Sequence, residues 1–317
     1  MVLTRAIKDL LAKRFNGKIR FDEPMAAHTS FRIGGTADAL VLPETVEDIM
    51  DLLQILAAEN ISWSVFGGGA NLLVRDGGIR GVVISPSPGL SNIRMAEGKT
   101  KTVAINVQSG VSLWDLCRFA SDKGLSGLAF AAGIPGTIGG AAMMNAGTAE
   151  GDMSDVLTSL EIVTGQGKIR RVDRNQMTFS YRSLGLPPDA AGGEGKPGII
   201  VSATLQLDQT DPDLVQNEFE TRLLQRKQSQ PGGFSAGSFF KNPPGAPPAG
   251  ELIDKAGLKG FVVGGAEVSK KHANFIINRK NASAGDVLVL MEIIRKRVYE
   301  AFGITLEPEV KIIGEEG

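Results

Sequence analysis

Two glycine-rich stretches are the features that most constrain how this chain can fold. The first, Gly67-Gly-Gly-Ala-Asn-Leu-Leu-Val74, follows an alternating segment, residues 61–66, which predicts a strand entering a tight turn. The second covers residues 131–147, with five glycines and few charges. The chain has 40 glycines in 317 residues, whereas average usage would give about two dozen. Such an excess indicates places where the backbone must turn tightly or approach another group closely.

These stretches can bind a ligand, although tight turns and a glycine-rich core turn are the alternatives. Successive N–H groups after a strand can form an anion-binding nest, and a weakly charged glycine stretch can wrap around a long, partly apolar ligand. No Gly-x-Gly-x-x-Gly follows a strand, and no Gly-x-x-x-x-Gly-Lys-[Ser/Thr] occurs, which disfavours Rossmann dehydrogenases and P-loop NTPases. Two stretches about sixty residues apart favour one dinucleotide held between subdomains, FAD rather than NAD.

Composition limits the partners and the compartment. The 34 basic and 35 acidic residues nearly cancel and form no block of like charge, so we expect neither a nucleic-acid nor a membrane partner. Charges interrupt the amphipathic segment 1–15, which therefore predicts a helix and not a signal peptide. The single cysteine, Cys117, and the lack of a Cys/His cluster predict no internal disulfide and no metal site. We expect a monomer in a reducing cytoplasm.

Hydrophobic patterning predicts an α+β chain. Helical spacing and capping residues occur in residues 1–15, 43–59, 112–124, 213–227 and 283–302. Strand patterns occur in residues 61–66, 72–74, 81–84, 102–108, 156–164, 169–172, 199–207 and 306–313, and residues 186–198 read as a Pro/Gly loop. We expect an N-terminal helix over residues 1–19, subdomains over 20–85 and 86–209, and a C-terminal domain over 210–317.

Ser238 is a candidate proton donor. It lies in Ser235-Ala-Gly-Ser-Phe-Phe-Lys-Asn-Pro243, against two aromatic residues. Taken alone, this segment is better explained as an ordinary strand with a turn at Asn-Pro. His28 and His272 have no Gly-x-Ser-x-Gly partner, which disfavours a hydrolase. A working serine would therefore donate a proton rather than attack a carbonyl.

Two other polar residues have both a functional and an ordinary explanation. Arg182, in Phe179-Ser-Tyr-Arg182, could pair in a bidentate manner with a substrate carboxylate, or it could be a surface arginine. In residues 306–313 the alternation places Leu306, Val310 and Ile312 on one face and Glu309 on the other, as in a half-buried terminal strand.

Eight motifs, taken together, resemble one family. They are His28-Thr-Ser-Phe-Arg-Ile-Gly-Gly35, Gly67-Gly-Gly-Ala-Asn-Leu-Leu-Val74, Gly133-Ile-Pro-Gly-Thr-Ile-Gly-Gly140, Asn145-Ala-Gly147, Tyr181-Arg182, Ser235-Ala-Gly-Ser-Phe-Phe-Lys-Asn-Pro243, His272-Ala-Asn-Phe-Ile-Ile-Asn278 and Glu307-Pro-Glu-Val310. In this order and spacing, over about residues 20–313, the chain resembles the UDP-N-acetylenolpyruvoylglucosamine reductases (MurB).

The resemblance implies a fold and a reaction. The fold would be a two-subdomain FAD-binding fold of the vanillyl-alcohol-oxidase (PCMH) type, over the two predicted subdomains, followed by a C-terminal α+β substrate-binding domain. NADPH as co-substrate would reduce non-covalently bound FAD, and the flavin N5 would pass hydride to C3 of the enolpyruvyl group of a UDP-sugar. The product would be UDP-N-acetylmuramate, a peptidoglycan precursor made in the bacterial cytoplasm for the cell wall on which cell shape and division depend.

The family pattern also implies three catalytic residues. Arg182 and Glu309 would flank the substrate carboxylate, the arginine countering its charge and a protonated Glu309 hydrogen-bonding to it or aiding proton delivery. Ser238 would protonate C2. Hydride addition at C3 leaves an enolate, a strong base, which makes a weakly acidic serine a credible donor.

Binding residues follow from the same motifs. The resemblance places the FAD pyrophosphate and the flavin against Gly67, Gly68, Gly69, Asn71, Ile134, Pro135, Gly136, Thr137, Gly140 and Asn145. It places the substrate near Tyr181, Lys227, Asn242 and Glu267, of which Lys227 and Asn242 would contact the uridine diphosphate.

The chain differs from the family pattern at two places, and two other functions are alternatives to this one. Position 28 is histidine where the family usually has asparagine, and residues 186–198 contain no tyrosine, which indicates the class without a tyrosine-bearing substrate loop. A sugar or alcohol oxidase of the same fold would explain the glycine stretches but not Ser238 and Glu309. A nucleotide-sugar binding protein without catalysis would not need Arg182, Ser238 and Glu309 together.

Overall fold

The computed structural model describes residues 2–96, 101–193 and 196–317. Contacts divide the chain into two compact units: unit 1 contains residues 1–21, 39–68 and 81–225, and unit 2 contains residues 22–38, 69–80 and 226–317. Residues 69–80 belong with the C-terminal segment because strand β4 (Leu72–Val74) pairs in parallel with β21 (Lys311–Ile313). The units are therefore discontinuous in sequence, and the predicted borders at residues 19, 85 and 209 stay predictions.

Unit 1 contains a six-stranded antiparallel sheet in the order β12-β11-β17-β7-β6, with β8 paired to β17. The strands are β6 (Ile93–Met95), β7 (Thr102–Gln108), β8 (Leu125–Ser126), β11 (Leu157–Val163), β12 (Ile169–Asp173) and β17 (Ile199–Gln209). The strands predicted at 102–108, 156–164, 169–172 and 199–207 are thereby confirmed, because their Val, Ile and Thr residues favour the pleated strand.

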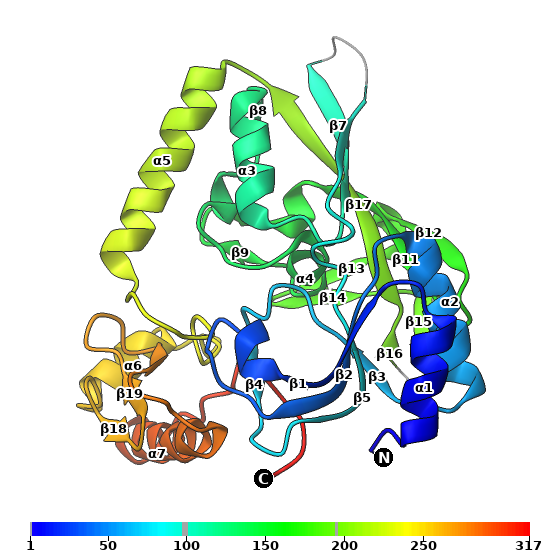
Figure 1. Ribbon diagram of the computed structural model, residues 1–317. Helices are drawn as coiled ribbons and strands as arrows, with labels where there is room; N and C mark the ends of the chain where they lie inside the picture. The colour runs from blue at the N-terminus through cyan, green and yellow to red at the C-terminus, as the bar shows by residue number, and fades with distance from the viewer. Residues whose placement is uncertain (1, 97–100, 194–195) are drawn as a thin grey trace. The chain divides into compact units, whose positions relative to one another are not determined.

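Helices cover both faces of this sheet (Figure 1). Ile162 and Ile200 face α3 (Leu113–Asp122) and α4 (Ile138–Met143), whereas their neighbours Val163 and Ile199 belong to the core around α2 (Val46–Ala58). Alternation along a strand sends successive side chains to opposite faces, and this gives the sheet two cores. The helices predicted at 43–59 and 112–124 are confirmed.

A smaller sheet has the order β1-β2-β5-β3. Its strands are β1 (Lys18–Pro24), β2 (Thr36–Leu42), β3 (Trp63–Val65) and β5 (Ile79–Ile84), and the chain passes from one unit to the other within β1, β2 and β5. The helices α1 (Arg5–Arg14) and α2 bury leucines in the same core as this sheet. A capping box between Thr45 and Asp48 begins α2.

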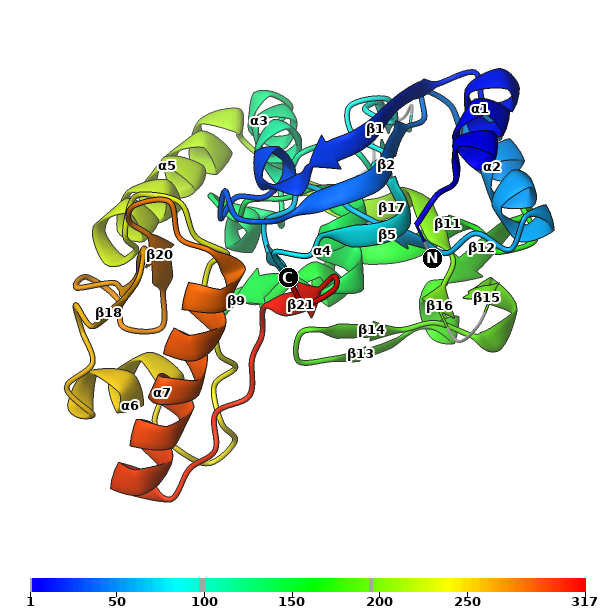
Figure 2. The same cartoon turned by 60° about the horizontal axis from the view of Figure 1, so that its bottom comes forward.

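Short elements complete unit 1. They are β9 (Gly147–Thr148), β10 (Gly151–Asp152), β13 (Thr178–Ser180), β14 (Ser183–Gly185), β15 (Ala191–Gly193), β16 (Lys196–Pro197) and the 3₁₀ turns η2 (Ala129–Ala131), η3 (Met153–Asp155), η4 (Arg174–Gln176) and η5 (Pro188–Ala190). The prediction of a plain loop at 186–198 was wrong, because η5 and the pair β15–β16 lie there. Pieces of two or three residues are too short to show a period. Figure 2 shows β13 and β14 as a separate ribbon hairpin.

Unit 2 packs helices on short strands. It contains η1 (Met25–His28), β4 and β21, the sheet β18 (Val262–Val263), β19 (Ala266–Val268) and β20 (Ile276–Asn278), and the helices α6 (Ala249–Lys255) and α7 (Ala284–Phe302). The helix α5 (Pro212–Ser229) ends in this unit. The helix predicted at 283–302 is confirmed: Ser283 is the N-cap of α7, and the apolar residues Val287, Leu290, Met291, Ile294 and Val298 are buried.

The predicted strand over 306–313 is regular only in β21, although Leu306 and Val310 are buried as expected. Pro308 has no N–H to give to a ladder, which interrupts the strand.

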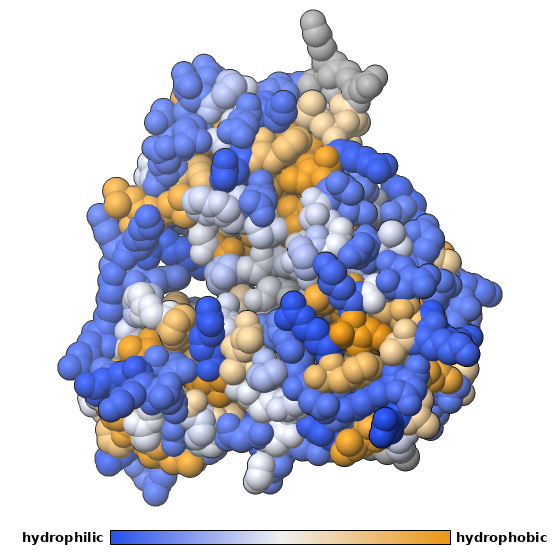
Figure 3. Space-filling view, viewed as in Figure 1, coloured by the Kyte–Doolittle hydropathy of each residue, from blue (hydrophilic) through white to orange (hydrophobic). Residues whose placement is uncertain are grey.

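The face drawn in Figure 3 is mainly hydrophilic, with apolar side chains in separate patches. Within the described ranges, no helix is both long and apolar enough to cross a membrane.

Candidate active site

The first two glycines of the first stretch, Gly67 and Gly68, touch the second stretch within unit 1. A Cβ on Gly67 would lie 2.5 Å from Oγ1 of Thr137, and a Cβ on Gly68 would lie 2.8 Å from Cα of Gly136. Only glycine permits this contact, since such distances are shorter than side-chain contacts allow. Gly67 and Gly68 therefore bring bare backbone directly against the turn at residues 136–137, and bare backbone of this kind fits the close approach of a ligand such as FAD.

Main-chain hydrogen bonds join residues 136–139 of the second stretch to residues 109–113. Gly136 O accepts from Leu113 N at 3.0 Å, and the N–H groups of Ile138 and Gly139 donate to Val111 O and Ser109 O, each at 2.9 Å. The predicted flavin residues Ile134, Pro135, Gly136, Thr137 and Gly140 thus lie in and around the first turn of α4.

Asn145, a predicted flavin residue, hydrogen-bonds to other segments of unit 1. It is 3% exposed with a positive φ of 38°. Its Nδ2 donates to Asp152 Oδ2 at 2.9 Å and to Ser180 O at 3.4 Å, and its Oδ1 accepts from Ser154 N at 3.0 Å. Asn145 therefore joins the second glycine stretch to the hairpin that carries Arg182.

Arg182 lies at the tip of that hairpin. Ser180 pairs with Ser183, which leaves Tyr181 and Arg182 as the two-residue turn between β13 and β14. Arg182 has a φ of +58°, which costs an arginine on the order of 1 kcal/mol. Its guanidinium carbon lies 4.8 Å from the centre of the exposed Tyr181 ring. This positively charged turn belongs to unit 1.

Ser238 and Glu309 lie on neighbouring main chains of unit 2. Ser238 is half-buried and pairs with Phe275 in an isolated bridge, and Phe239 and Phe240 after it are 1% exposed. The N–H of Glu309 donates to Phe239 O at 2.8 Å. Two motifs about seventy residues apart are thereby joined next to the candidate proton donor.

Asn71 connects the first glycine stretch to Glu309. Its Nδ2 donates to Glu309 O at 3.1 Å, and its carbonyl accepts from Lys311 N at 3.0 Å. Gly69 has a φ of +61°, and a Cβ there would lie 2.0 Å from His28 O. The side chain of His28 itself pairs with Glu23, with 2.7 Å between Nε2 and Oε1.

The remaining predicted substrate residues have partners of their own in unit 2. Asn242 Oδ1 accepts from Ala249 N at 3.0 Å, and Lys227, exposed in the last turn of α5, accepts at its carbonyl from Lys271 Nζ at 2.6 Å. Glu267 is 7% exposed and lies 3.2 Å from Nε of Arg279.

Sequence reasoning missed one buried polar residue, Asn274. It is 4% exposed and hydrogen-bonds to the main chain of Phe239 and Phe240. The available signal was a lone amide between apolar residues in the His272 to Asn278 motif, to which no role had been given. Throughout the described residues, no group of three or more His, Cys, Asp or Glu side chains could hold a metal ion.

Family models match both parts of the chain. Residues 37–173 match an FAD binding domain, and residues 228–313 match the C-terminal domain of UDP-N-acetylenolpyruvoylglucosamine reductase. The predicted FAD cofactor and the predicted fold class are thereby confirmed.

Relatives cover the whole length. The reductases of Desulfosudis oleivorans and Bacillus subtilis, both called UDP-N-acetylenolpyruvoylglucosamine reductase, are 46% and 43% identical to this chain, over 99% and 96% of it and 100% and 97% of their own length. The crystal structure of the Thermus caldophilus reductase, MurB, superposes with a TM-score of 0.75 at 34% identity, over 94% of this chain and 98% of that one. The 4-ethylphenol oxidase of Gulosibacter chungangensis, with a TM-score of 0.50 at 20% identity over 66% of this chain and 44% of its own, is similar in fold alone.

Near-complete coverage by relatives and two matching family models lead to one conclusion. The chain belongs to the UDP-N-acetylenolpyruvoylglucosamine reductase family.

Proposed function

We propose that the chain reduces UDP-N-acetylglucosamine enolpyruvate to UDP-N-acetylmuramate with NADPH as co-substrate, and that Ser238 supplies the proton. The observation that carries this proposal is the 2.8 Å hydrogen bond from Glu309 N to Phe239 O, because it places the candidate acid and the candidate carboxyl group on adjacent main chains. An oxidase of the same fold would need neither.

The reaction adds two hydrogens across the enolpyruvyl double bond. Bound FAD, once reduced by NADPH, would supply a hydride from N5 to C3. The electron pair displaced from the double bond then develops negative charge at C2 and in the neighbouring carboxylate. Fixed positive groups and hydrogen-bond donors stabilise such charge before a proton arrives.

The chain's own residues would complete the addition. The guanidinium of Arg182 would counter the charge of the substrate carboxylate, and a protonated Glu309 would hydrogen-bond to it or aid proton delivery. The Oγ–H of Ser238 would then pass its proton to C2. Serine is a weak acid, so this step depends on a strongly basic acceptor held beside it.

The substrate would be covered without a tyrosine-bearing loop. The two tyrosines are Tyr181 and Tyr299, and residues 186–198 contain none. Tyr181, Lys227, Asn242 and Glu267 are our candidates for substrate contacts. We further propose a bacterial cytoplasmic enzyme of peptidoglycan precursor synthesis that acts as a monomer and binds no nucleic acid.

The assignment is tested by following the flavin under anaerobic conditions. NADPH should bleach the yellow holoprotein, and UDP-N-acetylglucosamine enolpyruvate should then restore the oxidised spectrum and yield UDP-N-acetylmuramate. A reduced flavin that the UDP-sugar leaves bleached would contradict the proposed function. Reoxidation by an alcohol or sugar in place of the UDP-sugar would support the oxidase instead.

Replacing Ser238 by alanine tests the proton donor. Ser238→Ala should bind FAD and accept hydride from NADPH at the normal rate, but flavin reoxidation by the UDP-sugar should slow about 10²- to 10⁴-fold, the range for loss of a general acid. Stopped-flow absorbance separates the two half-reactions. Ser91→Ala, an exposed serine of unit 1, is the matched control and should react normally. A normal reoxidation rate in Ser238→Ala would remove Ser238 from the mechanism.

A further inference from the structure

The segment that carries Ser238 has little regular structure of its own. Ser238 and Phe240 each pair through one isolated bridge, to Phe275 and Pro308, and Gly237 has a φ of +79° with nothing within 4 Å of the Cβ position. A sheet ladder would fix a serine through its neighbours, but this segment has none. Other contacts must fix the position of the hydroxyl.

Asn274 supplies those contacts. Its carbonyl accepts from Phe239 N at 2.7 Å, its Oδ1 accepts from Phe240 N at 2.9 Å, and its Nδ2 donates to Phe240 O at 2.8 Å. The side chain thus binds both polar groups of one main-chain residue and is 4% exposed. The amide accepts through Oδ1 and donates through Nδ2 at the same time, whereas a carboxylate cannot donate and an aliphatic side chain can do neither.

The main chain of Asn274 is fixed by a hydrogen bond to the side chain of His272. Its N–H donates to Nδ1 of His272 at 3.2 Å, and Oγ of the buried Ser269 accepts from the N–H of Lys271 and His272 at 3.1 and 3.3 Å. Burial lowers the pKa of His272, which keeps its ring neutral at pH 7 and leaves Nδ1 able to accept. The ring packs edge-on against Phe275, 4.9 Å between centres.

The main chain of Phe239, to which Asn274 hydrogen-bonds, also hydrogen-bonds to Glu309. The carbonyl of Phe239, whose N–H binds Asn274, accepts from Glu309 N at 2.8 Å. Phe239 and Phe240 are both 1% exposed and pack edge to face, 5.2 Å between ring centres. A shift of this dipeptide would therefore move Ser238 on one side and Glu309 on the other.

We propose that Asn274 is a positioning residue that holds the hydroxyl of Ser238, together with the main chain of Glu309, in place for proton delivery. The inference rests on the proposed role of Ser238. Asn274 touches neither the substrate nor the cofactor in this role, because it acts through the main chain of residues 239 and 240.

The test is a double-mutant cycle on the holoprotein. Asn274→Asp keeps the acceptor for Phe240 N and loses the donor to Phe240 O, so flavin reoxidation by UDP-N-acetylglucosamine enolpyruvate should slow about 10- to 100-fold, as for a small misplacement of a reacting group. Reduction by NADPH and FAD content should not change. In the Ser238→Ala background, Asn274→Asp should cause a clearly smaller further loss, because the hydroxyl that it positions is gone and only the main chain of Glu309 can still shift.

Equal losses with and without the Ser238 hydroxyl would overturn the proposal, since a merely structural residue would slow both backgrounds alike. Asn274→Ser, whose shorter side chain cannot span both groups of Phe240, repeats the cycle if Asn274→Asp yields no holoprotein. Asn278→Asp is the matched control: this amide binds Phe31 O and Ala282 N, and its effect should be the same in both backgrounds. Failure of the unsubstituted protein to be reoxidised would refute the proposed function and not this inference.

Discussion

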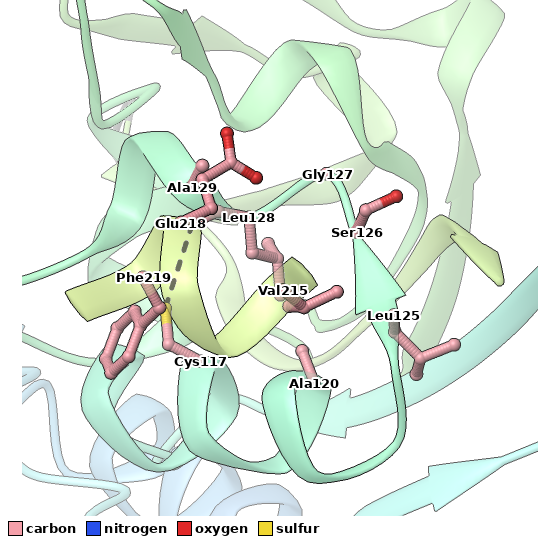
Figure 4. A pocket seen from close by; sticks show the side chains of 10 residues that line it. All are labelled: Cys117, Ala120, Leu125, Ser126, Gly127, Leu128, Ala129, Val215, Glu218 and Phe219. Carbon is pink, nitrogen blue, oxygen red and sulfur yellow. Dashed lines mark hydrogen bonds between the residues drawn. The ribbon is translucent and has the colours of Figure 1, made fainter. Parts of the chain in front are cut away.

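At the scale of single residues, Cys117 shows how burial alone sets reactivity. It lies on α3 beside a hollow of about 10 Å³ lined also by Val215 and Phe219 (Figure 4), and its thiol points to Leu128 O at 3.9 Å. A hollow of this size is at the lower limit for one water molecule. Burial raises the pKa of the Cys117 thiol to about 12. The lone cysteine is therefore a small apolar core residue.

This pKa predicts the response of Cys117 to alkylation. Because the thiolate is the reactive form, iodoacetamide should not label the native protein at pH 8 but should add one group after unfolding in guanidinium chloride. The neutral thiol stabilises the fold fully below the unfolded pKa of about 9.0, and this contribution should decline as the pH rises towards 12. Mass spectrometry measures the label, and rapid labelling of the native protein would contradict the prediction.

At the scale of elements, the contact between the two glycine stretches is the part of unit 1 that a substitution can test most directly. The first stretch follows the strand β3. The helix α4 lies within the second stretch. The helix α4 does not move easily, because its buried residues Ile138, Ala141 and Ala142 belong to a core of the larger sheet. A methyl group at the contact must therefore push backbone against backbone.

Gly68→Ala should weaken FAD binding. Its Cβ would lie 2.8 Å from Cα of Gly136, so the stretches must separate, at a cost of about 1 to 3 kcal/mol in the free energy of unfolding. We expect the dissociation constant for FAD to rise at least about tenfold, the equivalent of 1.4 kcal/mol. Flavin fluorescence titration and thermal unfolding measure the two effects. Gly232→Ala, with nothing within 4 Å of its Cβ, should change neither, and unaltered FAD affinity in Gly68→Ala would refute the contact.

At the scale of the whole molecule, each unit is assembled from segments far apart in sequence. Unit 2 gains residues 69–80 through the parallel pairing of β4 with β21 and through Asp76. Oδ1 and Oδ2 of Asp76 accept from Ala284 N and Gly285 N, each at 2.9 Å, at the start of α7. A carboxylate there satisfies free N–H groups and favours the helix dipole.

Asp76→Ala should destabilise the protein by about 1 to 2 kcal/mol, the range for a lost helix cap. Urea unfolding monitored by circular dichroism measures this. Asp9→Ala, an exposed carboxylate on α1, should leave the free energy of unfolding within about 0.5 kcal/mol. An Asp76→Ala variant as stable as the Asp9→Ala variant would show that the capping carboxylate contributes nothing.

The sequence by itself determined the local features of the fold, namely its helices, its helix caps and its longer strands. The stripe of α7, the capping boxes and the longer strands were predictable because periodicity and capping act within a few residues. Eight ordered motifs also indicated the family and the FAD cofactor, both now confirmed. The roles of Arg182, Ser238 and Glu309 were predictions of that resemblance and stay so.

Tertiary structure decided the contacts between distant segments. Read alone, Ser238 was better explained as part of a strand, and Asn274 had no role at all. Folding places Asn274 against residues 239 and 240, Glu309 against Phe239, and Asn71 against Glu309. No local pattern encodes such pairs, because hydrogen bonds to the main chain of a distant segment leave no side-chain periodicity to read. The sequence determined which residues are present and which elements carry them, and only the fold determined which of them hold one another in place.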